Sequence, residues 1–225
     1  MRKDAVFSDK HLEISEKPDD FFTREGDEVQ IKIVRQCSAQ VAGMTVKKMT
    51  DYKSIEDYII SVPDFPKPGI LFRDITGILN DADGLKLTLD ALYKALENVE
   101  FDLVAGLEAR GFLFGVSLAE HFHKPFVPVR KKGKLPRETV GVTYDLEYGQ
   151  ASIEVHKDAI KPGQKVVIID DLLATGGTAK AAAHLIEKLG GKVELLLFVI
   201  ELFDLHGRDV LKGYNIETLT KFPGH

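Results

Sequence analysis

The chain has 225 residues, of which 44% are hydrophobic and 29% are charged, and its formal net charge is −5. These proportions are those of an ordinary soluble globular protein and exclude a wholly disordered chain. They also argue against two classes of partner: no apolar run approaches the roughly 20 residues of a membrane helix, and the acidic balance lacks the basic stripe of a general nucleic-acid-binding protein.

The first fifty residues differ in composition from the rest. Met1–Gly43 carries nine Asp or Glu and seven Lys or Arg residues, and its apolar residues follow no clear period. Only Val29–Val34 alternates like a short strand. We expect residues 1–50 to be a poorly ordered extension, either a real appendage or the result of a start assigned upstream of Met44 or Met49. The second explanation is favoured, because so little apolar surface cannot offset the entropy of ordering the segment.

Residues 51–225 form the predicted main domain, in which helices and strands alternate. A short helical pattern at Ile55–Ile59 and a Pro-rich loop precede this alternation. Continuous apolar strands between helices indicate a parallel sheet covered by helices on both faces. Such sheets bind ligands beyond the carboxyl ends of their strands, so we expect the chemistry there. The predicted helices are Asp83–Glu97, Gly111–His123 and Thr178–Leu189, and the predicted strands are Phe101–Leu107, Pro125–Arg130, Lys165–Asp170 and Val193–Leu202.

The segment Val166–Thr178, VVIIDDLLATGGT, carries the strongest site signal. Asp170 and Asp171 end a buried strand, where two carboxylates are costly to desolvate without a partner. The loop after them opens a helix, so its backbone N–H groups can cradle a phosphate while the acids bind sugar hydroxyls. This combination indicates a ribose 5-phosphate site. Neither GxxxxGK[ST] nor GxGxxG occurs, which argues against a P-loop and against an ordinary dinucleotide fold.

Basic residues gather at two further places. Arg110 follows a predicted strand, where its forked donors suit phosphate oxygens; a capping turn with a surface salt bridge is the alternative. Lys131, Lys132, Lys134 and Arg137 lie in the predicted loop Lys131–Val140. A run of charges is usually a solvated face, but a mobile basic loop in an acidic chain with a phosphate cradle favours a lid over a polyanion.

These segments resemble the type I phosphoribosyltransferases, and among them the adenine phosphoribosyltransferase family. VVIIDDLLATGGT is similar to the family's phosphoribosyl pyrophosphate motif. Asp64–Thr76 resembles its adenine-binding hood, Gly106–Gly115 its pyrophosphate loop, and Arg130–Gly149 its flexible loop with the acid segment behind it. The final FPGH resembles bacterial members. The likeness runs from about Ser54 to the C-terminus, and the departure is the N-terminal extension.

The resemblance implies an α/β, type I phosphoribosyltransferase fold, with a central, mostly parallel sheet flanked by helices and a small hood. It implies a purine-salvage homodimer that transfers the 5-phosphoribosyl group from phosphoribosyl pyrophosphate to adenine, giving AMP and pyrophosphate. Magnesium (Mg²⁺) would arrive on the substrate rather than on metal-binding residues of the protein. A non-proline cis peptide at Glu108–Ala109 is also implied. The implied site residues are Glu147 as catalytic acid or base; Asp170, Asp171, Ala174, Thr175, Gly176, Gly177, Thr178, Arg110, Lys131 and Lys134 for phosphoribosyl pyrophosphate; and Leu71, Phe72 and Arg73 for adenine.

Three alternatives stay open at this point. In one of them the N-terminal segment is an interaction module attached to an enzyme, although its weak periodicity favours a tail. The phosphate motif is shared across the class, so the chain could use another base, or it could be a non-catalytic regulator that binds nucleotide on the same fold. Glu147 alone would be one more surface acid, and only the resemblance gives it a role. The single cysteine, Cys37, allows no internal disulfide and favours a reducing compartment, and we expect a cytoplasmic enzyme.

Overall fold

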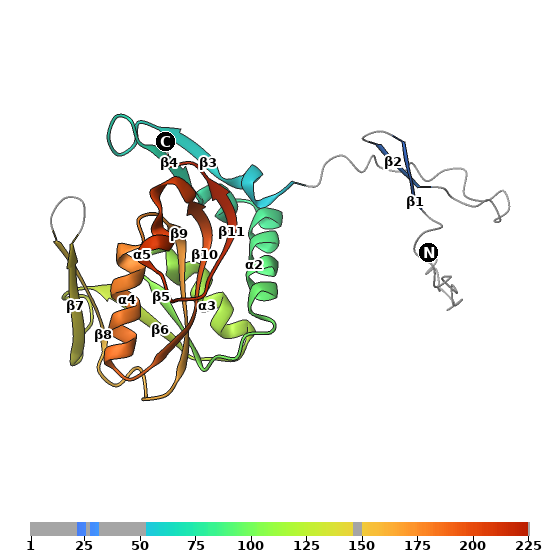
Figure 1. Ribbon diagram of the computed structural model, residues 1–225. Helices are drawn as coiled ribbons and strands as arrows, with labels where there is room; N and C mark the ends of the chain where they lie inside the picture. Colours follow the sequence, from blue (N-terminus) through green and yellow to red (C-terminus); the bar gives the residue numbers. More distant parts are fainter. Residues whose placement is uncertain (1–21, 26–27, 32–52, 146–149, 225) are drawn as a thin grey trace, which may run out of the picture. The chain divides into compact units, whose positions relative to one another are not determined.

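The computed structural model describes residues 22–25, 28–31, 53–145 and 150–224 (Figure 1). The chain divides into two units, Met1–Thr50 and Asp51–His225. In the first unit, β1 (Phe22–Glu25) pairs antiparallel with β2 (Glu28–Ile31), and β2 overlaps the strand predicted at Val29–Val34. The other residues of that unit, and with them the expectation of poor order, lie outside the described residues.

A seven-stranded sheet forms the centre of the second unit, with the strand order β11-β10-β9-β5-β6-β8-β7 (Figure 1). The first five strands in this order are mutually parallel, whereas β8 joins β6, and β7 joins β8, in antiparallel fashion. The predicted mostly parallel sheet is therefore confirmed. The strands are β5 (Leu103–Leu107), β6 (Phe126–Lys131), β7 (Thr139–Asp145), β8 (Gln150–His156), β9 (Lys165–Leu173), β10 (Lys192–Leu202) and β11 (Ile216–Phe222).

Helices cover both faces of this sheet, and each face has its own apolar core. On one face α4 (Gly177–Lys188) buries four alanines, whose small side chains let the helix lie close to β9 and β10. On the other face α2 (Ala82–Leu96) and α3 (Arg110–His121) bury residues such as Leu92 and Phe114. The three helices agree with the predicted ones to within two residues at each end. Asp81 caps α2 by accepting the N–H groups of residues 83 and 84, as expected of an N-cap aspartate.

A small hood lies against the C-terminal segment of the chain (Figure 1). It consists of η2 (Ile55–Tyr58), the antiparallel pair β3 (Ile60–Pro63) and β4 (Leu71–Asp74), and α1 (Thr76–Leu79). Arg73 is buried and holds this contact, since its guanidinium donates to Ser61 Oγ and, over 3.0 Å, to the carbonyl oxygen of Pro223. The remaining short elements are η3 (Phe203–Leu205) and α5 (Gly207–Val210).

The sequence pattern missed six of the described strands, among them β1, β3 and β4, and misplaced several ends. β7, β8 and β11 were not predicted, and the predicted loop Lys131–Val140 includes the end of β6 and the start of β7. β9 continues beyond Asp170 to Leu173, so the paired acids lie inside the strand rather than at its end.

Candidate active site

A cavity of about 410 Å³ opens at the carboxyl ends of β5 and β9, where the parallel sheet was expected to bind its ligand. It brings together three residues predicted for phosphoribosyl pyrophosphate, Lys131, Asp170 and Thr178. The hood residues are not part of its wall. The residues that line it are Leu107, Glu108, Val129, Lys131, Tyr144, Ala151, Ser152, Ile153, Asp170 and Thr178.

The predicted phosphate cradle, residues 174–178, connects β9 to α4. Gly176 has φ +80° and is the N-cap residue of the helix, a left-handed conformation that favours glycine. A Cβ on Gly176 would lie 2.7 Å from the carbonyl oxygen of Gly207. The structure therefore gives one reason for this glycine: the protein's own backbone packs against the loop.

Gly207 is a residue that sequence reasoning missed. A Cβ there would lie 2.2 Å from the carbonyl oxygen of Ala174, so only glycine fits between α5 and the cradle. The next residue, Arg208, fixes α5 by donating to the buried carboxylate of Glu201 over 2.7 and 2.9 Å, and its guanidinium lowers the pKa of that carboxyl. The only local signal was a His-Gly pair, which is common in turns.

The two adjacent acids have different surroundings, although their carboxyl groups influence each other. Asp170 lines the cavity, whereas Asp171 faces α3 and lies 2.7 Å from Nε of Arg110. Burial and the neighbouring Asp171 charge raise the pKa of Asp170 well above its ordinary value. Burial also raises the pKa of Asp171, although Arg110 acts in the opposite direction. The acids are therefore held at a cost to stability, which is typical of a functional site.

Arg110 connects the sheet to the hood. Besides its ion pair with Asp171, its guanidinium lies 5.4 Å from the ring centre of Phe72, and Phe72 packs edge-on against Phe65. The Glu108–Ala109 peptide just before Arg110 is cis, which confirms the expectation drawn from the family resemblance. The structure thus places the guanidinium predicted to bind phosphate next to an aromatic ring, at the N-terminus of α3.

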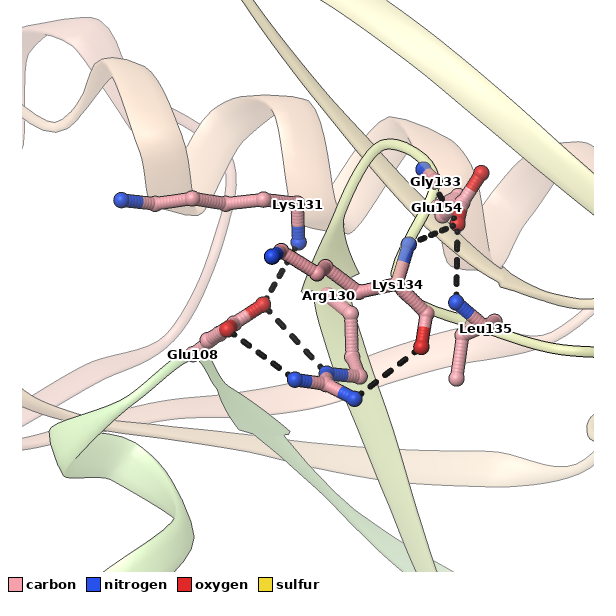
Figure 2. Close-up of polar contacts among 7 residues, drawn as sticks. All are labelled: Glu108, Arg130, Lys131, Gly133, Lys134, Leu135 and Glu154. Atoms are coloured by element: carbon pink, nitrogen blue, oxygen red, sulfur yellow. Dashed lines mark hydrogen bonds and ion pairs between the residues drawn. The ribbon is translucent and has the colours of Figure 1, made fainter.

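The basic loop is held in place by two carboxylates (Figure 2). Glu108 accepts the guanidinium of Arg130 at 3.2 and 3.4 Å and the backbone N–H of Lys131 at 2.8 Å, and these donors lower its pKa. On the other side, Glu154 accepts the backbone N–H groups of residues 133–135. The side chains of Lys131 and Lys134 are exposed. The backbone of the first part of the loop is thus hydrogen-bonded to these two carboxylates, and the role of the loop as a lid stays a prediction.

The predicted adenine residues lie on β4 of the hood. Leu71 and Phe72 are half-buried, while the Arg73 side chain is engaged with Ser61 and the C-terminal segment. Any contact of Arg73 with a base must therefore come from its backbone. β4 pairs only with β3 among the described residues, so alternate backbone N–H and C=O groups along its other edge have no strand partner.

Glu147 lies outside the described residues, and the structure leaves its predicted role untested. Tyr144, which precedes it at the end of β7, lies with its hydroxyl 3.2 Å from Thr178 Oγ1. This contact connects β7 to the cradle. In the described part of the chain, no three His, Cys, Asp or Glu side chains gather as a metal site, and none of the helices there has the length and apolar character of a membrane span.

Comparison with known proteins identifies the family. The model of the phosphoribosyl transferase domain matches residues 78–216. The adenine phosphoribosyltransferase of Agathobacter rectalis is 57% identical over 172 residues, which are 76% of this chain and 99% of that protein. The solved structure of the Thermoanaerobacter pseudethanolicus enzyme of the same name has 55% identity and a TM-score of 0.73, covering 75% of this chain and 98% of that one.

A third relative has been solved with ligands. The Saccharomyces cerevisiae adenine phosphoribosyltransferase, complexed with an imino-altritol bisphosphate and adenine, is 42% identical with a TM-score of 0.69, over 73% of this chain and 96% of that one. Each of these three relatives aligns with this chain over at least 96% of its own length. The chain therefore belongs to the phosphoribosyltransferase family, and within it to the adenine phosphoribosyltransferases.

Proposed function

We propose that the chain transfers the 5-phosphoribosyl group of phosphoribosyl pyrophosphate to adenine, giving AMP and pyrophosphate. The observation that carries the proposal is the single cavity in which a residue of the cradle, a strand acid and a loop lysine meet: Thr178, Asp170 and Lys131. The names of the relatives at 57% and 55% identity support adenine as the acceptor base. A phosphate, a sugar and a second polyanionic group are the three parts of this substrate.

The reaction is a displacement at the anomeric carbon, with an oxocarbenium-like transition state, as in other glycosyl transfers. The cradle N–H groups of residues 174–178 would hold the 5-phosphate, and Asp170 would hold the ribose hydroxyls. Lys131, Lys134 and Arg110 would offset the charge that develops on the departing pyrophosphate. These contacts orient the sugar and exclude water, which matters because hydrolysis of the activated sugar competes with transfer.

Binding of adenine and transfer of its N9 proton require further residues. Phe72, half-buried beside the Arg110 guanidinium, offers a flat apolar ring that suits a purine. The free edge of β4 at Leu71 and Arg73 offers backbone donors and acceptors for the adenine edge. Glu147 is the proposed acid or base near adenine, taking the N9 proton or hydrogen-bonding N7; this role rests on the family resemblance alone.

Magnesium is proposed as part of the substrate complex. The donor set fits this, because the oxygens of Asp170 at the cavity wall are ligands that Mg²⁺ accepts. Mg²⁺ is usually held by one or two carboxylates together with substrate phosphates. Bound there, it would supply charge neutralisation for the pyrophosphate.

The direct test is a panel of bases. Purified protein is incubated with phosphoribosyl pyrophosphate, Mg²⁺ and one of adenine, hypoxanthine, guanine, uracil or orotate, and the nucleotide formed is separated and measured. We expect AMP and pyrophosphate in equal amounts from adenine, and little product from the other bases. Faster use of another base would make the chain a different phosphoribosyltransferase, and binding without turnover would make it a regulator.

We further propose that the enzyme is a homodimer that uses the exposed face of α3. Leu113 and Val116 are 48% and 53% exposed there, and their i, i+3 spacing places them side by side. The double variant Leu113→Glu, Val116→Glu should sediment as a monomer, because two charges cannot be buried without partners, while the wild-type chain sediments as a dimer. Leu87→Glu on α2, also exposed at 37%, is the control and should stay dimeric. A double variant that remains dimeric would move the interface elsewhere.

A reducing, cytoplasmic location is proposed from the lone Cys37.

Residues 1–50 are proposed to be dispensable. A relative with 99% of its length aligned covers only 76% of this chain, so catalysis in that relative proceeds without an equivalent of the remainder. A chain that begins at Met44 should fold, keep its oligomeric state, and form AMP within about twofold of the full-length rate, since surface changes of this kind are usually near neutral. Loss of activity on truncation would give the extension a catalytic role.

A further inference from the structure

Glu154 on β8 is a buried carboxylate with an unusual set of donors (Figure 2). It is 7% exposed. One of its oxygens accepts the backbone N–H groups of three consecutive residues, Gly133, Lys134 and Leu135, at 2.9, 3.2 and 3.3 Å. Its other oxygen accepts from Thr139 Oγ1 at 3.2 Å. A buried charge is costly unless it is hydrogen-bonded, and these four donors compensate it.

The three backbone donors come from a single turn of the basic loop. Gly133 has φ +81°, and a residue in this conformation allows successive N–H groups to converge on one anion. The same turn is fixed from the opposite side, because Arg130 donates over 3.0 Å to the carbonyl oxygen of Lys134 while it also binds Glu108. Glu154 and the Glu108–Arg130 pair therefore hold the turn between them, as Figure 2 shows.

The anchored turn directly follows a residue of the cavity wall. Lys131, two residues before the turn, lines the cavity, and so do Ser152 and Ile153, the two residues that precede Glu154 on β8. The Lys132 N–H donates to the carbonyl oxygen of Ser152 over 3.1 Å. The length of the Glu154 side chain thus sets how far the loop backbone lies from β8. It thereby sets where the exposed side chains of Lys131 and Lys134 lie relative to the cavity.

We propose that Glu154 is a positioning residue for the pyrophosphate part of the substrate, an inference that rests on the proposed function. Its side chain is long enough for the carboxylate to accept the three N–H groups of the turn. These hydrogen bonds hold the turn in the shape that presents Lys131 and Lys134 to a polyanion before the substrate binds. A loop that must be ordered during binding lowers affinity, so loss of the anchor weakens binding of the pyrophosphate group. Binding of adenine at the hood, which shares no residue with this turn, is unaffected.

Two substitutions of Glu154 separate the effect of side-chain length from the effect of charge. Glu154→Gln removes the charge but keeps an oxygen at the same distance for the three N–H groups, and its amide can donate to Thr139. Glu154→Asp keeps the charge but is one methylene shorter, so it cannot hold the turn at its present place. Glu138→Ala is the control, because Glu138 is exposed in the same loop and pairs only with the exposed Lys157 among the contacts of its side chain in the described residues.

The experiment measures KM for phosphoribosyl pyrophosphate, KM for adenine and kcat, together with calorimetric titration of inorganic pyrophosphate. We expect Glu154→Asp to raise the KM for phosphoribosyl pyrophosphate and the Kd of pyrophosphate by about tenfold, with the KM for adenine within about twofold. Glu154→Gln should stay within about threefold of the wild type for all of these, and Glu138→Ala should not differ from it.

Three results would overturn the inference: an unchanged pyrophosphate Kd in Glu154→Asp, an equal rise of both KM values, or a loss in Glu154→Gln as large as in Glu154→Asp. Pyrophosphate titration needs no turnover. A wild-type protein that binds pyrophosphate but makes no AMP would therefore refute the proposed reaction while the comparison of the two Glu154 variants still decides the role of this residue. Absence of pyrophosphate binding in the wild type would refute the positioning role itself.

Discussion

Gly176→Val is expected to reduce kcat/KM for AMP formation by at least about a hundredfold, the usual effect of losing a main group of oxyanion-binding donors. A valine cannot keep φ near +80° without strain, and its Cβ would lie 2.7 Å from the carbonyl oxygen of Gly207. The loop must move, and the N–H groups of the cradle move with it. The strained backbone should also lower the free energy of unfolding by about 1–3 kcal/mol.

Steady-state kinetics and thermal unfolding measure the two effects, and Gly163→Val provides the control. Gly163 also has a positive φ, +85°, but nothing lies within 4 Å of its Cβ position, and it precedes β9 at the other end of that strand. We expect Gly163→Val to lose stability and keep its kcat/KM. Equal activity in Gly176→Val and the wild type would show that the loop does not bind the phosphate.

Asp170→Asn is expected to lower kcat/KM by about 10²–10³-fold and to make the folded protein more stable at neutral pH. The activity falls because the amide binds ribose hydroxyls and the magnesium complex less well than a carboxylate does. The stability rises because the wild-type carboxylate is buried next to Asp171, which raises its pKa well above the ordinary 3.8. The asparagine keeps an oxygen for the Asp171 N–H, the contact that Asp170 makes over 2.9 Å.

The pH dependence of this gain has a defined sign. A carboxyl whose pKa is raised in the folded state binds its proton more tightly there than in the unfolded state, so the wild type loses stability as the pH rises from about 4 towards the folded-state pKa of Asp170. Asp170→Asn lacks that loss, and its unfolding temperature should exceed that of the wild type by a margin that widens between about pH 4 and pH 7. A margin that does not change with pH would contradict the raised pKa.

Asp171→Asn is the matched comparison. Arg110 already offsets part of the Asp171 charge, at 2.7 Å, and lowers the pKa that burial raises. The gain in stability should therefore be smaller than in Asp170→Asn. Its effect on catalysis should appear in the use of phosphoribosyl pyrophosphate more than in binding of adenine, because freeing Arg110 disturbs the pyrophosphate side of the site; equal losses for both ligands would indicate misfolding.

The parts of the fold that were predictable are local in the sequence. The strand, the glycine turn and the helix at Val166–Thr178 follow one another directly, so the pattern of apolar residues and glycines contains the whole unit. The β7–β8 hairpin was missed although Val140, Val142 and Tyr144 alternate with polar or small residues, because the charged residues before Thr139 favoured a long loop. Strand β11 was missed because its buried positions are few.

The parts that were not predictable depend on contacts between distant segments. Nothing near Gly207 in the sequence indicates that it packs behind Ala174 and Gly176, and nothing near Glu154 indicates that its carboxylate holds the turn at residues 133–135. The ion pair of Asp171 with Arg110 joins β9 to α3, and nothing in the predicted strand at residues 165–170 indicates it. Each of these features is fixed by packing that only the folded chain reveals.

A crystal structure of the chain with AMP tests the central claim most directly. We expect the 5-phosphate against the backbone N–H groups of residues 174–178, the ribose hydroxyls at the Asp170 carboxylate, and the adenine ring beside Phe72 with its edge on the backbone of β4. That arrangement would place the site where the carboxyl ends of β5 and β9 meet. A nucleotide bound away from this cavity, or one whose phosphate lies at the Lys131–Lys134 turn while residues 174–178 contact nothing, would contradict the account.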